Sequence, residues 1–137
     1  MKTRYLIITS ILMSMIFLSS CKEEPKEAIN TLEDEAKEIE NLAERSKDIN
    51  NAEDAFVLLR DLNQAMKHVR DAVLLLDNQF NKIDDEAKKE SIEERFAKVN
   101  KEIDNNLNTI SKNLDPYKDS EKVDQMMKKL EQVMISK

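Results

Sequence analysis

Two side chains stand out as candidates for chemistry: Cys21 is the only cysteine of the chain and His68 is the only histidine. A single thiol cannot form an intramolecular disulfide, so the Cys21 thiol is available for covalent modification. His68 has no second histidine or glutamate at the i±3 and i±4 spacings that helical metal sites use. We therefore expect Cys21 to carry the chemistry and His68 to be a partly exposed residue on a helix.

Carboxylates are abundant, and they cluster at 33–35 and again at 84–86. Such clusters could bind Ca²⁺ loosely, but they lack the glycine-containing loop of an EF-hand, and we expect them to be solvated helix faces. The chain contains no glycine at all. Phosphate-binding loops, dinucleotide fingerprints and nucleophile elbows all require glycine at fixed positions. The sequence therefore predicts a protein that is not an enzyme and that holds no cofactor or metal.

The residues before Cys21 have the layout of a secretory signal. Lys2 and Arg4 supply a short positive region, and an apolar run follows from Tyr5 to Leu18. The run is shorter than the ~20 apolar residues that a helix needs to cross a bilayer. We therefore predict a signal peptide over residues 1–20.

The four residues Leu18, Ser19, Ser20 and Cys21 place one aliphatic and two small residues directly before the cysteine. This pattern resembles the lipobox of bacterial lipoproteins. The resemblance covers residues 1–21 and implies that the Cys21 thiol receives a diacylglyceryl group and that the signal peptide is then removed. The new amino group is often acylated as well, with fatty acids such as palmitate. The expected partner of Cys21 is thus a membrane, held by its acyl chains.

The residues directly after Cys21 indicate the membrane in which the lipid anchor would be inserted. Lys22 stands where an aspartate would direct an enterobacterial lipoprotein to the inner membrane, so the resemblance implies the outer membrane. Lys22-Glu23-Glu24 also resembles a surface-export signal of some Gram-negative lipoproteins. Either the periplasmic face or the cell surface is compatible with this pattern, and in a Gram-positive cell the protein would lie outside the cytoplasmic membrane.

The remainder of the chain has the composition of a helical protein. Without glycine, and with only two prolines, β-hairpins and tight turns are disfavoured. The net charge of −6 argues against nucleic acid, because a nucleic-acid-binding protein presents a basic stripe. We expect a single domain over 26–136 with residues 21–25 as a short tether.

Apolar residues recur at alternating steps of three and four along most of this domain, which predicts helices. The first helix is expected over about 26–49. Asn51 is a good N-cap for a second helix over about 52–81. The second stripe fits a coiled-coil repeat, and five further apolar residues widen it: Leu58, Ala65, Ala72, Leu74 and Leu75. Because a wide stripe contacts two neighbours, this helix should be the central one.

The third helix could start after Asp84, or at a capping box that begins with Ser91, and it should reach about residue 113 before Pro116 ends it. Asp119 or Ser120 can cap a shorter last helix that runs to about 135. The three methionines of that helix, like Phe56 and Tyr117, could fill the core or form contacts for a partner.

The sequence thus predicts an all-α fold, an antiparallel bundle of three long helices plus a short C-terminal helix with coiled-coil-like packing. The expected function is that of a lipid-anchored, non-enzymatic interaction module of a bacterial cell envelope, whose protein partner the sequence does not identify. The alternative is a structural spacer, or an organiser that associates with itself through the stripe of the second helix.

Overall fold

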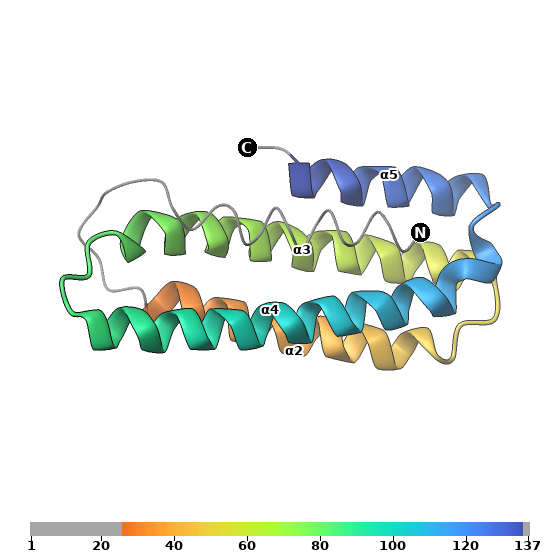
Figure 1. Ribbon diagram of the computed structural model, residues 1–137. Coiled ribbons are helices and arrows are strands. Elements are labelled where there is room, and N and C mark those ends of the chain that lie inside the picture. The colour runs from red at the N-terminus through yellow and green to blue at the C-terminus, as the bar shows by residue number, and fades with distance from the viewer. Residues whose placement is uncertain (1–25, 136–137) are drawn as a thin grey trace.

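Four α-helices and one 3₁₀ turn account for nearly all of residues 26–135, which are the residues that the computed structural model describes (Figure 1). The predicted signal peptide and lipobox, Cys21 and the predicted tether lie outside these described residues, as do residues 136 and 137. No strand occurs between residues 26 and 135. The predicted all-α bundle of three long helices and a short last one is therefore confirmed.

Helix α2 spans Lys26–Ser46 and buries one apolar stripe. The predicted end near residue 49 is wrong by three residues. The chain tightens after Ser46, where the amides of Lys47 and Asp48 bond to carbonyls three residues back. The Ser46 hydroxyl donates to the Ala43 carbonyl at 2.6 Å, and a bond of this kind competes with continuation of the helix. Ile49, in the turn that follows, still packs against the core.

Helix α3 spans Ala52–Phe80 and begins at the predicted cap. The Asn51 side chain accepts a hydrogen bond from the Asp54 amide at 2.9 Å, which satisfies one of the free donors of the first turn. The helix ends within one residue of the predicted boundary. Ile83 follows in the connection to the next helix and packs against the core from there.

Helix α4 spans Glu86–Leu114, and its cap is Asp85 rather than Asp84 or Ser91. The Asp85 carboxylate accepts from the amides of Ala87 at 3.0 Å and Lys88 at 3.2 Å. Two bonds made by a carboxylate at the positive end of a helix favour this start over the later capping box. The short 3₁₀ helix η2, Asp115–Tyr117, follows α4 directly and contains the proline that ends it.

Helix α5 spans Glu121–Ile135 and ends where the sequence predicts. All its methionines are buried, so they fill the core rather than a binding surface. Phe56 and Tyr117, the other candidate partner contacts, are half-buried and pack against the core.

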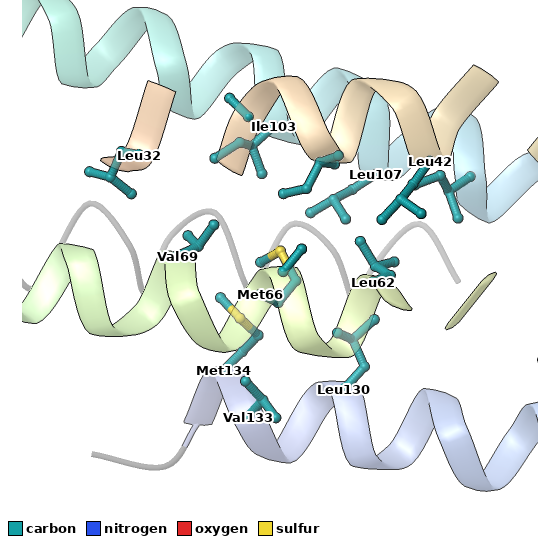
Figure 2. Packing of buried hydrophobic residues seen from close by; sticks show 14 of the residues in the cluster. Leu32, Leu42, Leu62, Met66, Val69, Ile103, Leu107, Leu130, Val133 and Met134 are labelled. Atoms are coloured by element: carbon teal, nitrogen blue, oxygen red, sulfur yellow. The ribbon is translucent and has the colours of Figure 1, made fainter. Parts of the chain in front are cut away.

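The helices pack as a series in which α4 lies against α2, α2 against α3, and α3 against α5. Figure 2 shows α3 between the α2–α4 pair on one side and α5 on the other, with Met66 and Val69 turned toward the pair. Consecutive helices run in opposite directions, so α3 and α5 run the same way. Three side-chain contacts fix their register: Lys122 with Glu53, Met126 with Asn63, and the Val133 carbonyl with Arg70. The predicted central position of α3 is only partly correct, because α2 also packs against two helices.

The width predicted for the α3 stripe is only partly correct. Leu58, Ala65 and Ala72 are buried, whereas Leu74 is 36% and Leu75 is 38% exposed. Both leucines lie on the outer face of α3. The helix is 29 residues long and α5 only 15, so α3 extends beyond the point at which α5 ends, close to Arg70.

Candidate functional site

The two ends of the bundle can be defined by the register between α2 and α3. Nδ1 of His68 lies 3.0 Å from Oε1 of Glu35, and Arg45 pairs with Asp61 at 3.1 Å, so these helices are antiparallel. Nine residues back from Glu35 is Lys26, and nine residues on from His68 is Asp77. The start of α2 is thus level with the last turns of α3. We call this the Lys26 end, and we call the opposite one, which carries η2, the Tyr117 end.

The solvent-facing side of α3 changes character as it approaches the Lys26 end. Along most of its length this face carries polar side chains, and it then presents Leu74 and Leu75 side by side. The two leucines and Ile135 are the large apolar side chains that are exposed among residues 26–135. The remaining residues of the face, at helical spacing and all exposed, are Arg60, Gln64, Lys67, Asp71 and Asn78. Adjacent exposed apolar side chains at the end of a polar helix face make this end a candidate contact surface.

Buried polar atoms without a hydrogen-bond partner also occur at the Lys26 end. Oε1 of Gln79 and Nζ of Lys82 are both buried and unpartnered. Such atoms are uncommon in folded proteins, because each one has lost its water without gaining a replacement. Oδ1 of Asn63, in the half of α3 nearer the Tyr117 end, is a further such atom, so these atoms do not distinguish one end from the other.

One polar cluster does join two helices near the Lys26 end. The Arg95 guanidinium of α4 donates to both carboxylate oxygens of Glu33 in α2, each at 2.9 Å, and to the Asn30 side chain at 2.8 Å. These hydrogen bonds from Arg95 lower the pKa of Glu33. A two-point bond of this kind fixes both position and orientation, and it sets α2 parallel to α4.

His68 is about half exposed, and its ring contacts Glu35. No third acidic, cysteine or histidine side chain completes a metal-binding group with them, and none exists elsewhere among residues 26–135. The arrangement fits a surface histidine that helps to register α3 against α2. His68 also lines two open surface depressions, one beside Lys67 and one beside Glu35.

Cys21, the residue expected to carry the chemistry, is separated from Lys26, where α2 starts, by the four residues 22–25. Leu18, Ser19 and Ser20 precede it and likewise lie outside the described residues. The described helices include none that is both long and apolar enough to cross a bilayer. The first described residue after Cys21 is Lys26, which is level with the last turns of α3 and thus close in height to Leu74 and Leu75.

Sequence reasoning assigned the two leucines to the buried stripe. One signal could have corrected this assignment: the face that they share carries polar residues three and seven positions before Leu74, at Asp71 and Lys67. The link between Arg95 and Glu33 was also missed. It joins residues far apart in the chain, and no local pattern marks such a pair.

Comparisons with protein-family models, with curated proteins and with solved structures find no significant match to this chain.

Proposed function

We propose that this protein is a lipid-anchored lipoprotein of a bacterial cell envelope, and that its helical bundle is a non-enzymatic module that binds another macromolecule. The observation that carries the proposal is Cys21, the only thiol of the chain, placed directly after Leu18-Ser19-Ser20 and an apolar run of signal-peptide length. Two or three acyl chains on one cysteine hold a protein firmly, because each buried CH₂ contributes about 0.8 kcal/mol.

The start of α2 supports a short tether. Helix α2 begins at Lys26, so only residues 22–25 separate it from Cys21. At ~3.3–3.6 Å per residue, these residues span at most ~14 Å. On this proposal the bundle is held close to the lipid, and a partner must come to the membrane surface to meet it.

The surface of the bundle supports a binding role better than a catalytic one. Between residues 26 and 135, charged side chains of both signs are interspersed along the helices, and most of their ion pairs are exposed. The Glu33–Arg95 pair joins α2 to α4 on the surface, and its hydrogen bonds lower the pKa of Glu33.

The lipid anchor is tested by the Cys21→Ala variant, with Ser20→Ala as a matched control that keeps a small residue before the cysteine. We expect the control to sediment with membranes and to show the added mass of acyl groups on Cys21. The Cys21→Ala variant should lack that mass and leave the membrane fraction. Equal membrane association without added mass in both variants would refute the anchor.

The binding role is tested by protease treatment of intact cells, followed by crosslinking on the side of the membrane where the bundle is found. Degradation in intact cells places the bundle on the surface, and protection places it on the inner side of the envelope. A crosslinked envelope or host protein that is lost in a surface-charge variant supports the binding role. A protein that is monodisperse and captures no partner on either side contradicts it.

A structural spacer is the second candidate, and the length of the rod favours it. Helices α3 and α4 each have 29 residues, which corresponds to about 44 Å at 1.5 Å per residue. Self-association through the α3 stripe is a weaker variant, because the stripe residues of α3 are buried in the bundle of one chain. Sedimentation over a range of concentrations tests it: a strict monomer contradicts an organiser that associates with itself.

A further inference from the structure

We propose that Leu74 and Leu75, at the end of the outer face of α3, contact the lipid surface to which Cys21 is anchored, so that the bundle lies tilted on the membrane. The inference rests on the proposed function, since it takes the anchor at Cys21 as given. Its partner is a lipid surface, and the contact is the insertion of two leucine side chains among lipid headgroups and upper acyl chains.

The first argument is the change of polarity along a single helix face. Leu74 and Leu75 are more than one-third exposed, whereas the same face carries Lys67 and Asp71 within the two preceding turns. A helix that faces water along its whole length gains nothing from two exposed leucines at one end. A helix whose end touches lipid does gain, because the transfer of apolar surface out of water is favourable.

The second argument is location. Leu75 lies two residues from Asp77, which is level with Lys26 in the register set by Glu35 and His68. At 1.5 Å per residue, that offset along the helix axis is about 3 Å. The tether of residues 22–25 reaches at most ~14 Å. An anchored Cys21 therefore holds both leucines within reach of the bilayer.

The third argument concerns the strength of the contact. Two leucines would bind a membrane only weakly in a free protein. A tether changes this, because it makes the contact intramolecular and raises the effective concentration of the lipid surface. A weak apolar patch is therefore sufficient to orient the bundle once the anchor holds it. The face of α4 turned away from α3 then stays accessible to a partner.

The chain contains no tryptophan, so a single introduced tryptophan is an unambiguous reporter of this contact. We would make Leu75→Trp, and Gln64→Trp as a matched control on the same face, eleven residues or about 16 Å nearer the Tyr117 end. Each is compared on phosphatidylcholine vesicles with and without brominated acyl chains. We expect the Leu75→Trp emission to shift to the blue and to be quenched by the brominated lipid, while Gln64→Trp emission is unchanged.

Each variant is attached to vesicles in two ways, so that a failure of the lipid contact can be distinguished from a failure of the proposed acylation. In one, each variant is purified from bacterial membranes with its native modification. In the other, the chain from Cys21 onward is coupled through its single thiol to a maleimide lipid in the vesicles. The buried apolar residues of the bundle lie between Ala28 and Met134, so this shortened chain retains its core, which circular dichroism would verify. Quenching of Leu75→Trp on the coupled chain supports the contact even if cells do not acylate Cys21.

Three outcomes would overturn the inference. Absence of quenching in both variants on the coupled chain means that the leucines do not meet lipid. Equal quenching of both means that the whole face lies on the membrane, without preference for its apolar end. A blue shift of Leu75→Trp that grows with protein concentration and needs no vesicles means that the occupant is a second copy of this chain. If Leu75→Trp lost its helical signal, Leu74→Trp would replace it, because Leu74 is exposed to nearly the same degree.

Discussion

The two ends of the bundle are built differently. At the Tyr117 end, side-chain hydrogen bonds connect the helices and their connections: the Tyr117 hydroxyl donates to the Ile49 carbonyl at 3.1 Å, and the Asn113 side chain donates to the Ser46 hydroxyl at 2.9 Å. Near the Lys26 end, Arg95 of α4 donates two hydrogen bonds to Glu33 of α2, but Leu74 and Leu75 are exposed.

Interhelical hydrogen bonds occur near both ends, so the exposed leucines are what distinguishes the Lys26 end. Long-range hydrogen bonds between helix ends define one arrangement of the backbone, because each donor has one acceptor at the correct distance. The exposed leucines of the Lys26 end instead leave free energy to be gained, because the transfer of apolar surface out of water is favourable. The end nearer Cys21 is therefore the one that we assign to the lipid surface.

The same substitution at the two ends should have the most unequal effect. Leu114→Ala, at the Tyr117 end, removes a side chain that is 1% exposed, and such changes cost about 2–5 kcal/mol of unfolding free energy. Leu75→Ala, at the Lys26 end, removes a partly exposed side chain and should change stability by less than about 0.5 kcal/mol. Urea unfolding followed by circular dichroism measures both. A comparable loss in the two variants would show that Leu75 belongs to the core.

The helix caps should show no difference between the ends. Asn51→Ala at the Tyr117 end and Asp85→Ala at the Lys26 end each remove side-chain acceptors of first-turn amides, at a cost of about 1 kcal/mol each. Thermal unfolding at neutral pH compares them. Asp84→Ala is the control and should leave stability unchanged, because Asp85 holds the cap position. A large loss in the Asp84→Ala variant would contradict this assignment.

The Tyr117→Phe variant tests the hydrogen bonding of the Tyr117 end itself. It keeps the ring against the core and removes only the hydroxyl that donates to Ile49. A neutral hydrogen bond of this kind contributes about 0.5–1.5 kcal/mol, and partial exposure places this one toward the lower value. Hydrogen exchange of the amides in the α2–α3 connection should become faster. Unchanged exchange there would mean that the bond does not hold this end together.

The smallest expected effect is that of Arg95→Met near the Lys26 end. The pKa of Glu33 is lowered by its hydrogen bonds from Arg95. A lowered folded-state pKa stabilises the protein at pH values above the ordinary value near 4.5, and this stabilisation is lost as the pH falls through the folded-state value. Because both side chains are about one-third exposed, we expect a loss below about 1 kcal/mol at neutral pH.

The measurement for Arg95→Met is urea unfolding at neutral pH and in acid. The difference from the unsubstituted protein should disappear in acid, where Glu33 is protonated in both proteins. Lys101→Met, which removes an exposed positive charge from the same helix, is the control and should show no such pH dependence. A difference that is equal at both pH values would mean that Arg95 acts by packing rather than by its charge.

The sequence by itself determined the features that depend on neighbours in the chain. The absence of glycine, the three-and-four spacing and the caps predict four helices with most boundaries within a few residues, because helix geometry is set by contacts four residues apart. The prediction of a lipid anchor likewise rests on residues that are adjacent in the chain, Leu18-Ser19-Ser20-Cys21. The sequence predicted Asp84 as the cap, whereas Asp85 is the cap in the structure. Its carboxylate reaches the amides of Ala87 and Lys88 in the first turn.

Only the tertiary structure decided which side chains of a wide stripe are buried. Apolarity alone does not predict burial at the margin of such a stripe, as Leu74 and Leu75 show: Val73 and Leu76 beside them are buried and they are not. Burial requires a neighbour at the same height along the rod and on the same side of the helix. The pairing of Arg95 with Glu33, like the Tyr117 hydrogen bond, arises from the register of helices that are distant in sequence. Such register is set by the packing of the whole core, which no single segment contains.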